Sequence, residues 1–230
     1  MVEHRNFYGR LKGKTLKPMQ RRDLEGLLPE LAVPGITVEE NPDRTLLDMD
    51  ALTQGKPLWL EIGFGGGEHL VHQAQQNPDV TFLGVEPYLN GMAMLLGKIR
   101  KAGVNNIRLH HGDARFVMDV LPANSVAKAF LLYPDPWPKA RHHRRRFVTQ
   151  DHLKPLHHVL QPGAKLRIAT DIEDYVRQSL QEVPKAGFEW DAQTPQDWRT
   201  PWGDWLSTRY EQKALREGRT PHYLTFTRST

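Results

Sequence analysis

The sequence contains no cysteine, and this absence excludes several kinds of site at once. Disulfide frameworks, zinc sites with cysteine ligands and thiol nucleophiles all require that residue. The chain also lacks an apolar run near the roughly 20 residues that a membrane-spanning helix needs, and its polar, basic N-terminus has no signal-peptide pattern. We therefore expect a cytoplasmic protein that has no membrane anchor.

The histidines do not form a recognisable metal-binding pattern, although the chain has 11 of them. They include three adjacent pairs, at 110–111, 142–143 and 157–158. Two histidines that share a zinc ion on one helix are instead separated by a full turn, as in the His-Glu-x-x-His motif. We expect no metal.

Positive charge is gathered in two blocks of the chain. The formal net charge is +4, from 31 basic and 27 acidic residues. Residues 1–22 hold basic side chains against the single acid Glu3, and residues 139–146 contain no acid at all. Such clusters are typical of a surface that binds nucleic acid, although a solvated surface is the ordinary alternative. The residues that we expect to contact a nucleic-acid backbone are Arg141, Arg144, Arg145 and Arg146.

Short apolar runs alternate with helical patterns over most of the chain. We interpret residues 1–50 as a basic, partly flexible N-terminal arm and lead-in, and residues 51–230 as the main domain. Strands are expected at 58–62, 80–86, 106–110, 126–133 and 164–170, with helices at 67–76, 89–102, 113–120, 146–160 and 172–183 between them and two last strands at 188–190 and 223–227. This alternation predicts an α/β fold with a doubly wound, mostly parallel sheet and helices on both faces.

Acidic residues fall at the carboxyl ends of the expected strands, where ligands bind in such sheets. They are Glu61, Glu86, Asp113, Asp135 and Asp171. A carboxylate after the second strand can accept hydrogen bonds from ribose hydroxyls. Asp113 can accept one from an adenine amino group, although Asp is also a good helix N-cap.

A glycine-rich turn follows the first expected strand. Gly63 and Gly65 allow left-handed backbone or close approach of a ligand, although a tight strand–helix turn is the plain alternative. A dinucleotide fingerprint would place a third glycine where this chain has Glu68, and a carboxylate there would repel a pyrophosphate. The turn therefore suits a ligand without phosphates, such as S-adenosylmethionine.

A proline-rich loop follows the fourth expected strand. Three prolines in PDPWP (134–138) stiffen this loop by fixing their φ angles. Between and after them the chain presents Asp135, Trp137 and Lys139. A rigid loop that presents an acid and an aromatic ring is difficult to explain by stability alone.

The segment from this loop to the second basic block, PDPWPKARHHRRRF, resembles the signature of the bacterial tRNA (guanine-N7)-methyltransferases. The segments at 60–70 (LEIGFGGGEHL), 170–171 (Thr-Asp) and 208–211 (Thr-Arg-Tyr-Glu) are also similar to that family. The likeness covers roughly residues 58–227. It implies a class I methyltransferase fold with a seven-stranded, Rossmann-like sheet. It also implies that the chain transfers a methyl group from S-adenosyl-L-methionine to N7 of a guanine in tRNA, at position 46 of the variable loop.

The resemblance also assigns roles to individual residues. It implies that Asp135 is the catalytic carboxylate, that Glu61 lies near the methionine amino group, that Glu86 binds the ribose and that Asp113 binds the adenine. The implied cofactor contacts are Glu61, Gly63, Gly65, Glu86, Asp113 and Asp135. The implied substrate contacts are Lys139, Asp171, Thr208, Arg209, Tyr210 and Glu211. The partner would be tRNA, with the protein itself a monomer or homodimer.

Two other functions stay open at this point. A non-catalytic RNA-binding protein on a Rossmann-like fold would explain the basic blocks but not the set of acids at the strand ends. An NAD-dependent oxidoreductase is opposed by Glu68 and by the lack of a clear catalytic His or Tyr arrangement.

Overall fold

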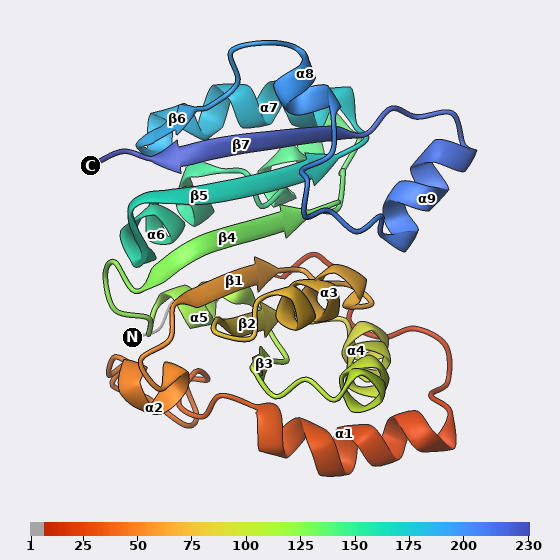
Figure 1. Cartoon of the computed structure of the whole chain (residues 1–230), viewed down its shortest axis with the longest axis vertical. Helices are drawn as coiled ribbons and strands as arrows, with labels where there is room; N and C mark the ends of the chain where they lie inside the picture. Colours follow the sequence, from red (N-terminus) through yellow and green to blue (C-terminus); the bar gives the residue numbers. More distant parts are fainter. Residues whose placement is uncertain (1–6) are drawn as a thin grey trace. The chain divides into compact units, whose positions relative to one another are not determined.

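A computed structural model describes residues 7–230 of the chain (Figure 1). The described residues form two compact units, of which the first ends at Pro122 and the second spans Ala123–Thr230. Glu3 and Arg5 of the first basic block lie outside the described residues. Each unit is built on strands of a mostly parallel sheet.

The first unit contains three parallel strands with helices between them. Its elements are α1 (Pro18–Leu31), α2 (Met49–Thr53), β1 (Leu58–Ile62), α3 (Glu68–Gln76), β2 (Thr81–Val85), α4 (Leu89–Ala102), β3 (Ile107–His110) and α5 (Ala114–Met118). β2 lies between β1 and β3, with Leu60 opposite Leu83 and Phe82 opposite Ile107. The strand residues are almost all buried, as expected for parallel strands covered on both faces.

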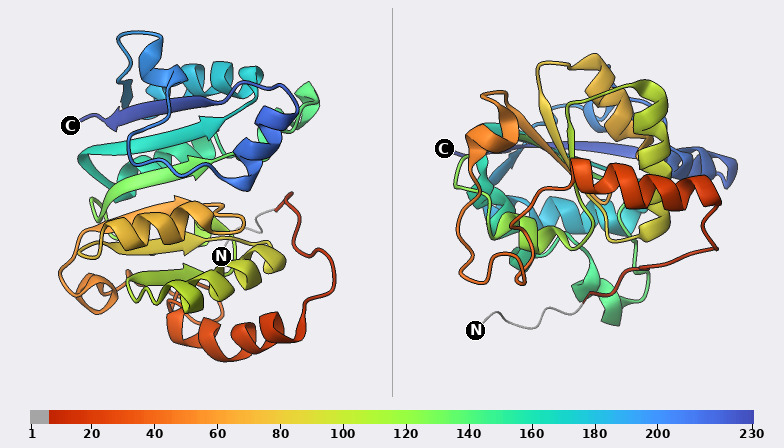
Figure 2. Two further views of the ribbon diagram at one scale, coloured as in Figure 1. Left: turned by 45° about the vertical axis from the view of Figure 1, so that its right-hand side comes forward. Right: turned by 90° about the horizontal axis from the view of Figure 1, so that it is seen from below.

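Helix α1 was not expected from the sequence, which was interpreted as an arm over this stretch. It packs against α4 and β3 through Leu24, Leu27, Leu28 and Leu31, whose spacing is that of one helix face (Figure 2). Its start is fixed by Pro18 in the first turn and by a hydrogen bond from the Lys17 amide to Gln20. Helix α1, which belongs to the predicted lead-in, is therefore a packed part of the first unit. The predicted domain boundary between residues 50 and 51 stays a prediction.

Arg44 attaches the lead-in after α1 to the rest of the first unit. Its guanidinium donates to the carbonyl oxygens of Ile36 and Phe116, each at 2.7 Å, and lies 3.6 Å from Asp119. Ala32 forms an isolated parallel bridge to the edge strand β3. This segment therefore covers part of an edge that would otherwise be unpaired.

The second unit contains three strands that run in one direction and one antiparallel strand. Its elements are β4 (Val126–Leu132), η1 (Ala140–Arg145), α6 (Gln150–Val159), β5 (Leu160–Thr170), α7 (Glu173–Glu182), η2 (Pro184–Ala186), β6 (Phe188–Trp190), α8 (Gln196–Arg199), α9 (Arg209–Arg216) and β7 (His222–Arg228). β4 pairs parallel with β5, whereas β7 runs antiparallel to both β5 and β6. Leu166 and Ile168 are buried on one face of β5, and Arg167 on the other face pairs with Asp204 at 2.7 Å.

One expected helix has different bounds in the structure. The helix predicted over 146–160 is shorter in the structure: α6 begins only at Gln150, because residues 146–149 are extended or turn-like, and the 3₁₀ segment η1 comes before them. Gly163, just beyond the predicted helix, lies within β5 with a φ of 77°. With these exceptions, the expected strands and crossover helices are present, and the predicted seven-stranded, mostly parallel α/β fold is confirmed.

The packing of α1 gives the first testable prediction. Leu28→Ala should lower the free energy of unfolding by about 1–2 kcal/mol, because it removes part of the apolar contact between α1 and the core of the first unit. Leu46→Ala is the matched control, since Leu46 is 57% exposed and should change stability by about 0.5 kcal/mol or less. Urea denaturation measures both, and equal values would mean that α1 does not belong to the folded unit.

Candidate functional site

Glu61 is buried near the end of β1 and has one well-defined partner. Its Oε2 lies 2.7 Å from Nδ1 of His69 on α3, and both side chains are 2% exposed. A buried carboxylate needs such a partner, because an isolated charge is costly to remove from water. His69 orients the Glu61 carboxylate, for which the resemblance implies a contact with the cofactor. The sequence pattern had not assigned a role to His69.

Glu86, directly after β2, holds the glycine turn in place. Its Oε2 accepts a hydrogen bond from the Gly65 amide at 2.7 Å, and its Oε1 accepts one from the Tyr88 amide at 2.9 Å. The side chain is 7% exposed. These bonds fix the carboxylate against the turn.

The glycine turn uses the backbone conformations for which glycine is suited. Gly63, Gly65 and Gly67 have φ angles of 70°, 57° and 74°. A Cβ on Gly63 would meet nothing within 4 Å, so the chain leaves open space above it. Gly91 of α4 packs directly on this turn, because a Cβ there would lie 2.3 Å from the Gly65 carbonyl oxygen.

Lys98 changes the electrostatics beside the turn. Its Nζ donates to the Gly66 carbonyl oxygen at 2.6 Å and lies 3.3 Å from Oε1 of Glu68. The cation offsets part of the negative charge of Glu68, so Glu68 alone opposes a pyrophosphate less strongly than the sequence suggested.

Asp113 caps the first turn of α5. Its Oδ1 accepts from the Arg115 amide at 2.9 Å, and its Oδ2 pairs with the Arg115 guanidinium. The capping role considered from the sequence is therefore present. Contact with an adenine stays a prediction for this residue.

Part of the N-terminal arm is attached to the start of α4. The Leu89 amide donates to the Leu11 carbonyl oxygen at 2.9 Å, and the Gly13 amide donates to Oδ1 of Asn90 at 2.7 Å. Asn90 Nδ2 donates in turn to the Lys14 carbonyl oxygen at 2.7 Å. These bonds give the arm a defined path over the turn that follows Glu86.

In the second unit, the proline-rich loop after β4 contains two strained residues. Tyr133 and Trp137 have φ angles of 50° and 44°, in the left-handed region that costs non-glycine residues energy. Each precedes a proline, which disfavours the ordinary helical conformation. Asp135 lies between them with an exposed side chain, and partial burial of its carboxyl group raises its pKa.

The basic segment η1 presents its side chains in different directions. Arg141 and Arg144 are exposed, as is Lys139 just before them. The Arg145 guanidinium lies over the Trp137 ring at 5.1 Å, and the His142 ring meets the same ring edge-on at 6.0 Å. This part of the predicted RNA-binding block is therefore packed against the proline-rich loop.

Arg146 requires a correction, because the sequence suggested that it contacts a nucleic-acid backbone. Its side chain is 1% exposed, and its guanidinium donates to Pro136, Gln178 and Asp174. The charge lies inside the protein and all of its hydrogen bonds go to the protein's own acceptors. Arg146 is thus not available to a phosphate group.

The segment at 208–211 divides into internal and surface residues. Thr208 caps α9 by accepting from the Glu211 amide at 3.3 Å. Glu211 is 3% exposed and accepts from Trp205 Nε1 at 2.9 Å and from the Tyr223 hydroxyl. Tyr210 is 44% exposed and Arg209 is half-buried.

Asp171 follows β5, as predicted, and is held by a residue that the sequence did not single out. Its carboxylate pairs with the guanidinium of Arg219, whose side chain is 37% exposed and also pairs with Glu217. These charge-assisted hydrogen bonds fix the orientation of the carboxylate.

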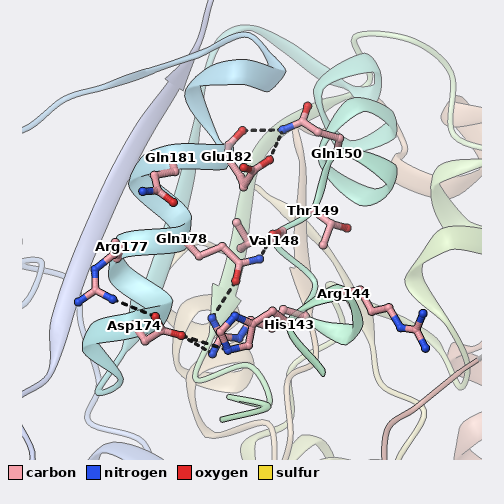
Figure 3. Close-up of a pocket in the computed structure, with 11 residues that line it drawn as sticks. His143, Arg144, Val148, Thr149, Gln150, Asp174, Arg177, Gln178, Gln181 and Glu182 are labelled. Carbon is pink, nitrogen blue, oxygen red and sulfur yellow. Dashed lines mark hydrogen bonds and ion pairs between the residues drawn. The ribbon is translucent and has the colours of Figure 1, made fainter. Parts of the chain in front are cut away.

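An open pocket of about 330 Å³ lies between η1, α6 and α7 (Figure 3). Arg144 and Arg177 supply positive charge at its wall, and Asp174 and Glu182 supply negative charge. Asp174 is already paired with Arg146, Arg177 and His143, so little of its negative charge is left unbalanced. The other lining residues are His143, Arg146, Val148, Thr149, Gln150, Gln178 and Gln181.

Within residues 7–230, no three His, Asp or Glu side chains are grouped as metal ligands. No helix of the described chain is long and apolar enough to cross a membrane.

Solved structures with a similar fold define the class. The 16S rRNA methyltransferase KamB aligns with a TM-score of 0.59 and 19% identity, covering 80% of this chain and 95% of that one. An antibiotic-related methyltransferase aligns with a TM-score of 0.56 and 15% identity, covering 85% and 98%. The [4+2]-cyclase SpnF also aligns, with a TM-score of 0.52 and 15% identity over 79% and 78%. The fold is that of class I S-adenosylmethionine-dependent methyltransferases, and at these identities the likeness shows the fold alone.

Sequence relatives define the family. The model of the Methyltransf_4 methyltransferase family matches residues 55–224. A tRNA (guanine-N(7)-)-methyltransferase of Ruegeria sp. (strain TM1040) is 70% identical over 224 residues, 97% of this chain and 88% of that protein. A protein of the same name from Roseobacter denitrificans is 71% identical over 98% of this chain and 97% of its own length. Another from Agrobacterium fabrum is 48% identical over 96% of this chain and 94% of its own length. The chain belongs to the tRNA (guanine-N7)-methyltransferase family.

Two glycines on one helix test the packing beneath the glycine turn. Gly91→Ala should destabilise the protein by about 1–3 kcal/mol and weaken binding of S-adenosylhomocysteine, because the new methyl group displaces the Gly65 carbonyl. Gly97→Ala is the control on the same helix. Its Cβ would meet only Asp23 at 3.9 Å, so stability should be unchanged or higher by up to about 1 kcal/mol. Urea denaturation and calorimetry measure both properties, and identical behaviour of the two variants would contradict the proposed packing.

Proposed function

We propose that this chain transfers a methyl group from S-adenosyl-L-methionine to N7 of a guanine in tRNA, at position 46 of the variable loop. The observation that carries the proposal is the similarity to proteins named tRNA (guanine-N(7)-)-methyltransferase, which reaches 71% identity over nearly the whole chain. The stiff, strained loop around Asp135 supports it, because strain of this kind is concentrated at functional sites.

The first unit supplies the residues that would hold the cofactor. Open space above Gly63 suits the approach of a ligand to the backbone, and Glu86 holds a carboxylate against the same turn through two backbone amides. Two carboxylates and no phosphate-binding lysine or arginine in the turn fit a ligand that carries an amino group and ribose hydroxyls. The residues proposed to contact the cofactor are Glu61, Gly63, Gly65, Glu86, Asp113 and Asp135.

The bound cofactor supplies an electrophilic methyl group on a positively charged sulfur. Guanine N7 has a lone pair and no proton, so no side chain has to act as a general base for its attack. As N7 gains the methyl group, the guanine ring becomes cationic. We assign to Asp135 the role of accepting hydrogen bonds from guanine N1–H and the amino group and of stabilising this charge.

The tRNA contacts are assigned to the side chains that face solvent. Lys139, Arg141 and Arg144 are exposed basic residues close to Asp135 in the chain, and phosphate groups are their natural partners. Further proposed contacts with the substrate are Arg145, Asp171, Arg209 and Tyr210. For Thr208 and Glu211 we propose a different role, which is to hold the start of α9 so that the residues between them are presented to tRNA.

Replacement of the proposed catalytic carboxylate tests the function directly. Wild-type protein incubated with unmodified tRNA and S-adenosyl-L-methionine should produce N7-methylguanosine at position 46, mapped by cleavage at the modified base. Asp135→Asn should reduce the rate by about 100-fold or more, because it removes the charge that stabilises the cationic ring. Its thermal stability serves as the control for correct folding. An active Asp135→Asn variant would contradict the role of this residue, and unmodified tRNA after incubation with wild-type protein would contradict the function.

The pH dependence of methyl transfer gives a second test. Burial raises the pKa of Asp135 above the ordinary value near 3.8, and the reaction needs the charged form. The single-turnover rate should therefore fall, as the pH is lowered, at a higher pH than an ordinary Asp would give. The residual rate of Asp135→Asn should lack this limb. If the variant retains the same acidic limb as the wild type, a group other than Asp135 produces it.

A further inference from the structure

Arg146 makes three hydrogen bonds from inside the second unit. Its Nε donates to the Pro136 carbonyl oxygen at 2.8 Å, one terminal nitrogen to Gln178 Oε1 at 2.7 Å and the other to Asp174 Oδ2 at 2.7 Å. The guanidinium also lies over the Tyr175 ring, with 5.2 Å between the central carbon and the ring centre. With a side chain that is 1% exposed, Arg146 joins the proline-rich loop to helix α7.

The partners on α7 form a fixed support. Tyr175 is fully buried, and Gln178 is held by its own bond from Nε2 to the Val148 carbonyl oxygen at 2.6 Å. The hydrogen bond from Arg146 lowers the pKa of Asp174, so this acid stays charged opposite the guanidinium. Figure 3 shows Asp174 and Gln178 side by side on the face of α7 that points toward η1.

The hydrogen bond to the Pro136 carbonyl oxygen is important because Pro136 is the residue directly after Asp135 in the chain. The loop has strained residues on either side of Asp135, and strained backbone of this kind persists only where the surrounding structure holds it. A hydrogen bond from a charged donor is stronger than one between neutral groups. The buried guanidinium therefore helps to hold the loop in this strained conformation.

We propose that Arg146 is a positioning residue for methyl transfer, which holds Asp135 in place by tying the Pro136 carbonyl to Asp174 and Gln178 of α7. The inference rests on the proposed function, because it gives Asp135 its role. It assigns to Arg146 a task different from that of its exposed neighbours, which bind RNA phosphates.

Arginine suits this task and lysine does not. The planar guanidinium presents its donors in a rigid fork and can bond three acceptors in different directions at once. A lysine ammonium keeps the charge, but it is a compact point at the end of a flexible chain. Arg146→Lys therefore separates positioning from charge.

The test compares Arg146→Lys with Arg144→Ala in steady-state methyl transfer. Arg146→Lys should lower kcat by about 100-fold, as expected when a catalytic group is displaced by about 1 Å, and should leave KM for tRNA within about twofold of the wild-type value. Arg144→Ala should mainly raise KM for tRNA, because this side chain is exposed and is assigned to a phosphate. Lys154→Ala, on the exposed side of α6, controls for loss of a positive charge elsewhere.

Salt dependence supplies a readout that does not require activity. Loss of one phosphate contact should reduce the slope of log affinity for tRNA against log salt by about 1. Arg144→Ala should show this reduction, whereas Arg146→Lys and Arg146→Met should keep the wild-type slope. A reduced slope for Arg146→Met would mean that Arg146 contacts a phosphate and would overturn the proposal.

A milder variant covers the case in which changes at Arg146 prevent folding. Asp174 is 42% exposed, so Asp174→Ala should fold while removing one of the three acceptors. It should lower kcat by about three- to tenfold. It should also lower KM for tRNA, because it releases Arg177 from an ion pair beside the basic surface. Unchanged kcat in Asp174→Ala, or in a folded Arg146→Lys, would overturn the proposal. Failure of the proposed function would instead appear as an inactive wild-type protein, and the salt slopes would then still show whether Arg146 binds RNA.

Discussion

The parallel pairing of strands is the constraint from which the candidate sites follow. In the first unit, β1, β2 and β3 run in the same direction and in close register, so Glu61, Glu86 and Asp113 occur near the ends of neighbouring strands. In the second unit, Leu132 of β4 is opposite Ala169 of β5, so Asp135 and Asp171 also follow neighbouring strand ends. Carboxylates that are far apart in the sequence are gathered in this way without any specific contact between them.

The residues that hold these carboxylates are as important as the carboxylates themselves. Glu86 is fixed by two backbone amides, and Glu61 by the ring of His69. The loop of Asp135 lies outside the strands and helices, and its prolines restrict the backbone without attaching it to the rest of the unit. Its start is attached to β5, because the Tyr133 amide donates to the Ala169 carbonyl oxygen at 2.7 Å. Further along the loop, Arg146 bonds to the Pro136 carbonyl oxygen and Arg145 packs on Trp137.

Features with a regular period or a special residue type could be predicted from the sequence. Buried strands, the glycine turn and the acids that follow the strands belong to this group. Helix α1 was missed even though Leu24, Leu27, Leu28 and Leu31 have helical spacing, because this basic stretch was judged to lack sustained periodicity and was interpreted as an arm. The ion pairs that fix Asp171 and attach the lead-in involve Arg219 and Arg44, and no local pattern shows which distant group an arginine will reach.

The basic segment around η1 shows why composition alone could not predict which of its side chains are exposed and which are packed against the protein. A 3₁₀ helix has three residues per turn, so side chains three positions apart point in the same direction. Arg141 and Arg144 are exposed, His142 and Arg145 contact Trp137, and His143 and Arg146 contact Asp174. One run of basic residues therefore forms three rows, of which one faces solvent, one packs on the loop of Asp135 and one is bound to α7. Because of this period of three, the residues that contact the loop, Arg145 and Arg146, alternate with the exposed Arg141 and Arg144 on one short segment. A change in the position of the loop therefore also changes the position of the proposed RNA contacts.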